Sequence, residues 1–148
     1  MEVYKEVKSL IPHRSPFLFV DQLTEVNEKI IKGRFKFKKE ISFFEGHFPN
    51  YPVVPGVILV ESMAQCGGAG LQQMGIYDPA SLFVLATVEK AKFRNQVKPD
   101  DTVEIEIENL RISSMMFRQS GKVYVDNEIA AEATWMCVIA SSGDSDDN

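Results

Sequence analysis

The sequence of 148 residues contains only two histidines and two cysteines. Two thiols, Cys66 and Cys137, are too few for the disulfide framework of a small secreted domain. Both have apolar neighbours in the sequence, so we expect free, buried thiols and a reducing compartment. The same scarcity argues against a metal site, because the histidines and cysteines are remote from one another in the sequence.

Long hydrophobic runs and an excess of positive charge are also absent. The longest apolar stretch, residues 53–60, contains a proline and a glycine and is too short to cross a bilayer. The first ten residues lack the apolar core of a signal peptide, so the cytoplasm is the expected location. The formal net charge of −5 disfavours attraction of the whole protein to nucleic acid. The remaining basic feature is a local group, Lys90, Lys92 and Arg94.

The amino-acid composition is that of an ordinary globular protein. Hydrophobic residues make up 45% of the chain and charged residues 25%, and the length suits one core. We therefore predict a single domain over residues 1–140. Residues 141–148 are small, polar and acidic, and we expect them to form a disordered tail.

Hydrophobic periodicity predicts one long helix and five or six strands. The segment from Gly56 to Met74 is apolar on nearly all sides, so this helix is expected to lie inside the fold. A short helix is predicted before Pro12, and residues 39–55 are too rich in proline and aromatics for a regular element. The predicted strands cover residues 17–26, 30–37, 81–88, 102–108, 115–125 and 129–139. An α+β fold in which an antiparallel sheet wraps a central helix satisfies both patterns.

His47 is the first candidate for chemistry. It lies in the irregular segment, between aromatic residues and prolines. An imidazole in apolar surroundings tends to stay neutral, and a neutral imidazole with a free nitrogen can act as a base. Taken alone, His47 is equally well explained as a loop histidine that hydrogen-bonds to a backbone carbonyl, and this simpler interpretation is the more frequent one.

Glu61 is the second candidate, because it is a carboxylate one and a half turns into an apolar helix. A buried carboxylate is costly unless it is paired, bound to a metal or protonated. A carboxyl group that is kept protonated near neutral pH can act as a general acid. The alternative is a glutamate at an exposed edge of the helix.

The predicted helix start at Pro55 and Gly56 is the third candidate. The first amides of a helix lack intrahelical partners and carry partial positive charge. Gly56 has no side chain to block a ligand oxygen, so this site can polarise a carbonyl group and stabilise an enolate. A base, an acid and an oxyanion donor together suit removal of a proton next to a carbonyl, with loss of a β-hydroxyl group as water. A proline that merely starts a helix explains this third feature equally well.

Several of these segments together resemble the FabZ family of (3R)-hydroxyacyl-[acyl carrier protein] dehydratases. The resemblance runs from about residue 9 to residue 138. It is carried by the run from Leu10 to Asp21, by Gly46-His47-Phe48-Pro49 through Pro52, by Pro55-Gly56-Val57, by Glu61, by Ala64-Gln65, and by Val88 to Arg94. A glutamate rather than an aspartate in the acid position resembles FabZ more than the related FabA.

The resemblance implies a hot-dog fold, a homodimer and in many relatives a trimer of dimers, with no cofactor. It implies that His47 takes the C2 proton and that Glu61 of the partner chain protonates the departing 3-hydroxyl group. It also implies that Gly56, with Pro55, Val57 and Phe48 around it, binds the thioester carbonyl, and that the partner is an acyl carrier protein. Since that carrier is acidic, Lys90, Lys92 and Arg94 are candidates for docking it, although a solvated strand face explains them equally well.

The chain departs from the family pattern in a few places. Asn50-Tyr51 stands where Gly-His is common, and Thr87 replaces a usual glycine. Asn95-Gln96 and Asp100 also differ from the pattern. These changes bear on the preferred acyl chain more than on the reaction. Arg14, which belongs to the motif, is expected to pair structurally with Asp21 or a glutamate rather than to contact substrate.

Two other functions remain open at the level of sequence. A hot-dog acyl thioesterase would share the fold, but it requires a carboxylate that activates water on the thioester. A non-catalytic acyl-binding or dimerisation module would bind ligand without turnover, and it would leave Glu61 unexplained.

Overall fold

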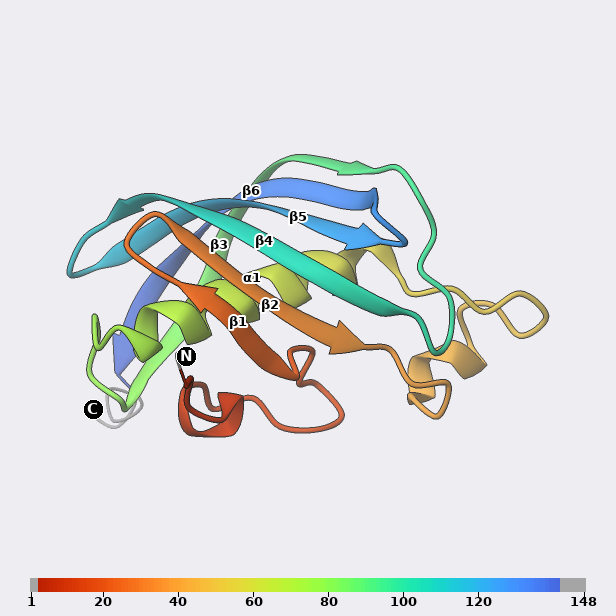
Figure 1. Cartoon of the computed structure of the whole chain (residues 1–148), viewed down its shortest axis with the longest axis horizontal. Coiled ribbons are helices and arrows are strands. Elements are labelled where there is room, and N and C mark those ends of the chain that lie inside the picture. Colours follow the sequence, from red (N-terminus) through yellow and green to blue (C-terminus); the bar gives the residue numbers. More distant parts are fainter. Residues whose placement is uncertain (1–2, 142–148) are drawn as a thin grey trace, which may run out of the picture.

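The computed structural model describes residues 3–141 as one antiparallel sheet curled around one helix (Figure 1). The helix α1 spans Gly56–Gln73. The strands are β1 (Gln22–Val26), β2 (Ile30–Lys36), β3 (Ser81–Phe93), β4 (Thr102–Ile112), β5 (Met116–Val125) and β6 (Glu128–Ser141). Two short 3-10 helices, η1 (Val7–Ser9) and η2 (Ser42–Glu45), lie in the connecting segments. The α+β architecture predicted from the sequence is confirmed.

The strand order in the sheet is β1-β2-β4-β5-β6-β3, and every neighbouring pair is antiparallel. The segment between β2 and β4 leaves the sheet, passes through α1, and returns as β3 at the far edge (Figure 1). β3 is therefore an edge strand of thirteen residues with one side unpaired in the single chain.

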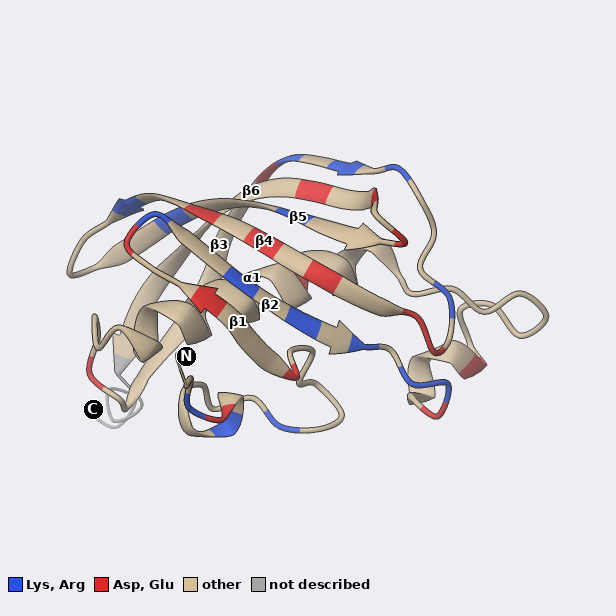
Figure 2. Cartoon of the chain, in the orientation of Figure 1, with Lys and Arg blue, Asp and Glu red and all other residues tan. Residues whose placement is uncertain are grey.

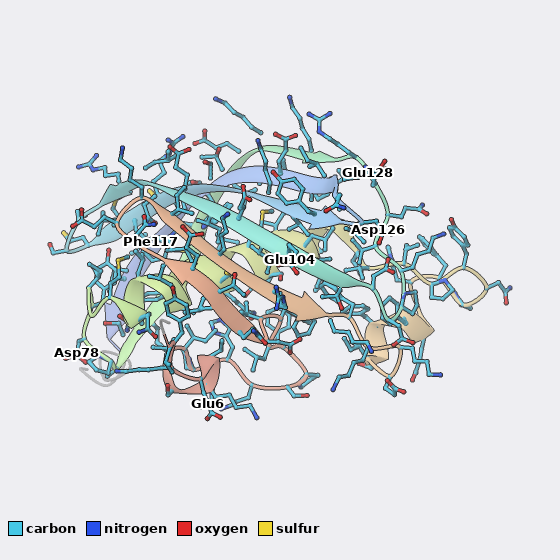
Figure 3. The ribbon with its side chains drawn as sticks, viewed as in Figure 1. Glu6, Asp78, Glu104, Phe117, Asp126 and Glu128 are labelled. Carbon is cyan, nitrogen blue, oxygen red and sulfur yellow. The ribbon has the colours of Figure 1, made fainter. Side chains whose placement is uncertain are left out.

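Alternating burial in β4 shows how the sheet encloses the helix. Val103, Ile105 and Ile107 are buried on the inner face, whereas Glu104 and Glu106 are exposed on the outer face. Figure 3 labels Glu104 on this outer face, and Figure 2 shows the red bands of β4 beside blue bands of β2. This alternation was predicted, because side chains on a strand point to opposite faces in turn.

The glycines of α1 let the helix approach its neighbours closely. A Cβ atom on Gly70 would lie 2.5 Å from the side chain of Ile31, and one on Gly68 would lie 2.6 Å from the ring of Phe83. Real Cβ atoms do not tolerate such contacts, so larger residues would push the helix away from the sheet. The glycines in the second half of α1 therefore permit the close approach of helix and sheet.

Asn and Asp residues close two tight connections of the sheet. Asn27 closes the β1–β2 turn, where its side-chain oxygen accepts hydrogen bonds from the amides of Lys29 and Ile30. Asp126 and Asn127 have φ values of 52° and 65° and form the β5–β6 turn; Figure 3 labels Asp126 and Glu128 there. Asp and Asn tolerate this left-handed backbone better than most residues do.

Two boundaries at the N-terminal end were predicted wrongly. The strand expected over residues 17–26 begins only at Gln22, because the backbone of Phe17 and Phe19 bonds to side chains of α1 instead of to a strand. The helix expected before Pro12 is a single 3-10 turn, in which Val7 is buried, while Val3 is 85% exposed.

The C-terminal strands are longer than predicted. β3 continues to Phe93, because its second half still pairs with β6, where Phe93 lies opposite Ala131. β6 includes Ser141, which the sequence assigned to the tail. The rest of that expected tail, residues 142–148, lies outside the described residues. Among residues 3–141, no helix combines the length and the apolar character that crossing a membrane requires.

Candidate active site

His47 lies at the start of the loop that follows η2, and its Nδ1 atom is 3.0 Å from the carbonyl oxygen of Val53. Since a carbonyl oxygen only accepts hydrogen bonds, Nδ1 is the donor, and in the neutral form of the ring this places the lone pair on Nε2. The ring of His47 stacks on Phe48, with centroids 4.2 Å apart. The simpler interpretation of His47, a bond to a backbone carbonyl, therefore holds, and the same bond selects the tautomer of the neutral ring in which Nε2 can act as a base.

The loop that carries His47 is closed by backbone hydrogen bonds. The amide of Val53 donates to the carbonyl of His47 over 2.9 Å, and the amide of Val54 donates to the carbonyl of Val97 over 2.8 Å. The hydroxyl of Tyr51 donates to Oε1 of Gln96 over 2.7 Å. Tyr51 and Gln96 are both departures from the family pattern, and the fold brings these two residues into contact.

The start of α1 lies just beyond this loop and agrees with the prediction. Pro55 caps the helix and Gly56 is its first residue. Among the residues described, the amides of Gly56 and Val57 have no hydrogen-bond acceptor. A Cβ atom on Gly56 would lie 2.8 Å from the ring of Phe93, so glycine is required for this ring to cover the helix start. Two unpaired helical amides at a glycine are suited to binding a carbonyl oxygen.

Glu61 lies farther along α1 in a different environment. Its Oε2 atom accepts a hydrogen bond of 2.9 Å from Nε2 of Gln65 and lies 3.7 Å from Nε2 of His13. Its side chain is 21% exposed, so the glutamate is neither fully buried nor at a fully exposed edge. A cavity of about 50 Å³ adjoins it, lined by Ile11, His13, Glu61, Ala64, Gln65, Gly68, Phe83, Leu85 and Cys137.

His13 is a polar neighbour of Glu61 to which the sequence analysis gave no role. Burial lowers the pKa of the His13 imidazole, the Glu61 carboxylate opposes this effect, and Arg14 adds to it. Nδ1 of His13 is buried and has no hydrogen-bond partner within the described part of the chain. His13 is therefore neutral near pH 7. The signal that could have identified it was its place in the Pro12-His13-Arg14 motif.

Arg14 has a structural role, as expected, but its partners differ from those predicted. Its guanidinium donates to the carbonyl oxygens of Lys8, Ile11 and His13 and so closes the N-terminal segment. Asp21 instead accepts a hydrogen bond from the amide of Lys36. The predicted pairing of Arg14 with an acidic side chain is therefore wrong.

Within a single chain, the structure does not bring His47 and Glu61 together. No hydrogen bond or ion pair joins them in residues 3–141, and the cavity beside Glu61 does not include His47. The surfaces of the His47 loop and the helix start are apolar and open, since Phe48 is 53% exposed and Val57 is 72% exposed.

Of the basic group Lys90, Lys92 and Arg94 at the end of β3, only the two lysines have charges that are free to attract a partner. Arg94 forms an ion pair with Glu132 over 2.6 Å, which lowers the pKa of that carboxyl group through the hydrogen bond. Among the described residues, Lys90 and Lys92 form no ion pair. Both line a hollow of about 390 Å³ together with glutamates such as the exposed Glu106 and Glu108. Residues 3–141 contain no group of three or more metal-binding side chains placed to hold an ion.

The arrangement of a curled sheet around one central helix is that of the hot-dog proteins. The structure superposes on the dehydratase heterocomplex ApeI:P from Xenorhabdus doucetiae with a TM-score of 0.81 and 15% identity, covering 95% of this chain and 94% of that chain. A hypothetical thioesterase from Streptococcus pneumoniae, solved with coenzyme A, superposes with a TM-score of 0.59 and 12% identity, over 81% of this chain and 85% of that chain. At such identities these matches establish the fold alone.

The sequence comparisons define the family. The model of the FabA-like domain matches residues 11–134. The 3-hydroxyacyl-[acyl-carrier-protein] dehydratase FabZ of Fusobacterium nucleatum is 39% identical over 137 residues, which are 91% of this chain and 95% of that protein. The FabZ of Bacillus licheniformis is 41% identical over 133 residues, covering 89% of this chain and 92% of its own. The chain belongs to the FabA-like family and, within it, groups with the FabZ dehydratases.

Proposed function

We propose that the protein is a dehydratase that converts (3R)-hydroxyacyl-[acyl carrier protein] to trans-2-enoyl-[acyl carrier protein] in fatty acid or related lipid biosynthesis. The observation that carries this proposal is the bond from Nδ1 of His47 to the carbonyl of Val53, which leaves Nε2 available as a base in the loop that leads into the helix start at Gly56. Membership in the family of FabZ relatives supports the same reaction.

The reaction uses three groups. Nε2 of His47 removes the proton from C2 of the substrate, next to the thioester carbonyl. The amides of Gly56 and Val57 donate hydrogen bonds to the carbonyl oxygen as negative charge develops there. Glu61 gives its proton to the 3-hydroxyl group, the C3–O bond breaks, and water leaves. The electron pair of the C2–H bond forms the double bond, so no cofactor is required.

The minimal active unit in this proposal is a homodimer, with each site built from His47 of one chain and Glu61 of the other. The lack of a contact between the two side chains within residues 3–141 of one chain supports this arrangement. β3 offers an unpaired edge, and along it and at the helix start several apolar side chains are exposed in the single chain: Phe48, Val57, Val84, Val88 and Phe93. Pairing of two β3 edges would satisfy the backbone and cover these side chains. A trimer of such dimers remains a further part of the proposal.

The substrate is delivered by an acyl carrier protein, and we propose Lys90 and Lys92 as its docking residues. Arg94, which belongs to the same group, contributes less because its charge is already paired with Glu132. An acidic carrier is attracted by unpaired lysines, which act mainly on the rate of encounter. We place the reaction in the cytoplasm, and the free, buried thiols of Cys66 and Cys137 support a reducing compartment.

The test is incubation of the purified protein with 3-hydroxyacyl-carrier substrates of several chain lengths, followed by mass analysis and a free-thiol assay. A dehydratase produces an enoyl thioester that is lighter by one water, with no release of thiol. A thioesterase instead releases the carrier thiol and a free acid. Tight binding with neither product would identify a non-catalytic acyl-binding module. Either of the last two results overturns the proposal.

A further inference from the structure

The tip of the His47 loop, residues 48–51, projects beyond the end of the sheet (Figure 1). Phe48 and Tyr51 are each 53% exposed there. The amide of Phe48 donates to the carbonyl of Tyr51 over 3.3 Å, and the amide of Tyr51 donates to the carbonyl of Phe48 over 2.9 Å. The tip is therefore a tight turn, and it carries the ring on which His47 stacks.

The two ends of the segment that contains His47 are bound to one neighbour, the connection between β3 and β4 at residues 94–101. Beyond the tip, the buried Val54 donates its amide to the carbonyl of the buried Val97. Before η2, the amide of Lys39 donates to Oδ1 of Asp100 over 3.0 Å. Backbone groups thus fix this segment on both sides of the loop, but neither bond reaches the tip.

The tip reaches the β3–β4 connection through a single side chain. The hydroxyl of Tyr51 donates to Oε1 of Gln96 over 2.7 Å. In the described part of the chain, no other side-chain hydrogen bond joins residues 48–51 to residues 94–101. Because Gln96 immediately precedes the buried Val97, the bond attaches the exposed tip to a fixed point of the core.

The position of the tip controls the His47 ring. Nδ1 bonds to the carbonyl of Val53, which is only 6% exposed, and one face of the ring stacks on Phe48 with centroids 4.2 Å apart. Val53 is held by the core, whereas Phe48 is held by the tip. If the tip moved, the imidazole would lose the contact that keeps it in line with the Val53 carbonyl, and Nε2 would no longer have one direction.

We propose that Tyr51 is a positioning residue, whose bond to Gln96 holds the tip so that Nε2 of His47 keeps one direction toward C2 of the substrate. This inference rests on the proposed dehydratase function. Tyr51 and Gln96 are both positions at which the chain departs from the family pattern. The bond therefore joins two residues that this pattern does not contain.

Tyr77 provides a matched control. Its hydroxyl donates to the carbonyl of Ser113 over 2.8 Å, and its ring packs against Phe83 and Phe117 of the sheet. Tyr51→Phe and Tyr77→Phe therefore each remove a hydroxyl that donates a hydrogen bond and keep the aromatic ring. Only the first of these changes frees the tip of the His47 loop.

Gln96 allows the bond to be removed from its other side. Gln96→Met removes the oxygen that accepts the Tyr51 hydroxyl, whereas Gln96→Glu keeps an oxygen acceptor of similar length. In the double variant Tyr51→Phe, Gln96→Met both partners are absent. If the two residues act through one bond, the second change adds no further loss to the first.

The first measurement is steady-state dehydration of a 3-hydroxyacyl thioester, with thermal melting of each variant. We expect Tyr51→Phe, Gln96→Met and the double variant each to lower kcat by about threefold to tenfold, the range that the loss of one hydrogen bond gives. KM should change less than about twofold, because the bond acts on the base and not on binding. Gln96→Glu and Tyr77→Phe should keep kcat within about twofold of wild type.

The second measurement observes the His47 ring directly, by nuclear magnetic resonance of protein labelled with heavy nitrogen at histidine. The chain has only two histidines, and His13→Gln assigns the signals. In the neutral wild type, His47 should show one protonated nitrogen, Nδ1, and one with a lone pair, Nε2. In Tyr51→Phe the two signals should move toward each other, because the ring samples both tautomers, whereas Tyr77→Phe should retain the wild-type signals.

The two measurements separate failure of this inference from failure of the proposed function. If wild type produces no enoyl thioester, the dehydratase proposal is wrong, whatever the nitrogen signals show. If wild type is active and either the kcat or the His47 signals of folded Tyr51→Phe match those of Tyr77→Phe, the positioning role is wrong. A loss in Tyr51→Phe that Gln96→Met does not reproduce would equally overturn the role of the pair.

Discussion

Nδ1 of His47 lies 3.0 Å from the carbonyl oxygen of Val53, and this single contact determines which imidazole nitrogen can take a proton. Val53 is held in turn by the bond from its amide to the carbonyl of His47. The loop thus fixes both the ring and its tautomer before substrate arrives, whereas Glu61 is fixed separately on α1.

The first prediction concerns the two reacting side chains. His47→Ala removes the base and Glu61→Gln removes the acid, so each should lower dehydration by about a hundredfold or more. Because both side chains are partly exposed in the single chain, folding should survive, as circular dichroism would verify. A folded variant with nearly normal turnover would show that the role assigned to that residue is wrong.

The second prediction tests whether the site is shared between chains. When His47→Ala and Glu61→Gln chains are unfolded and refolded together, about half of the dimers are mixed, and one of the two sites in each mixed dimer is intact. Activity should therefore recover to about a quarter of the wild-type value. Native mass spectrometry would show that mixed dimers form. If they form and remain inactive, both residues act from one chain.

The third prediction concerns the carrier. Charge reversal of Lys90 and Lys92 should slow the reaction with carrier-bound substrate and weaken its salt dependence, because steering acts through unpaired charge. The reaction with a small thioester mimic should change little. Lys8→Glu, an exposed reversal on η1, is the matched control. Equal losses with both substrates would indicate a folding effect instead of docking.

The fourth prediction concerns packing. Alanine favours an isolated helix over glycine by about 1 kcal/mol, but a Cβ atom at Gly70 would lie 2.5 Å from Ile31. We expect Gly70→Ala to lower the free energy of unfolding by about 1–3 kcal/mol, as overpacking does. Gly46→Ala, whose Cβ atom would meet nothing within 4 Å, is the control. Urea unfolding measures both, and a more stable Gly70→Ala would contradict the close approach.

The fifth prediction is a pH dependence of stability. Burial lowers the pKa of His13 below its ordinary value of 6.5, so below that pH the unfolded chain takes up this proton more readily than the folded chain. The stability contribution of His13 is therefore complete above 6.5 and is lost as the pH falls through the lowered pKa. Urea unfolding of wild type and His13→Gln at several pH values should show a smaller acid loss for the variant. Parallel curves would mean that the folded and unfolded states bind this proton equally.

The sequence by itself determined the features that depend on neighbouring residues. The strand over β4 and the apolar helix that begins at Gly56 both appear as predicted, because hydrophobic periodicity acts over a few residues. The motif also identified His47, Glu61 and Gly56 as candidates for one chemistry.

Only the tertiary structure decided the features that join distant parts of the chain. It showed that the Phe19 amide bonds to Gln65, 46 residues away, instead of extending β1. It also showed that Arg94, just after β3, forms an ion pair with Glu132 of the neighbouring strand β6. It also placed Glu61 beside His13 and apart from His47. Such contacts arise from the packing of a helix against a sheet and of one strand against another. Because no local pattern records which polar groups that packing brings together, the sequence alone could not decide them.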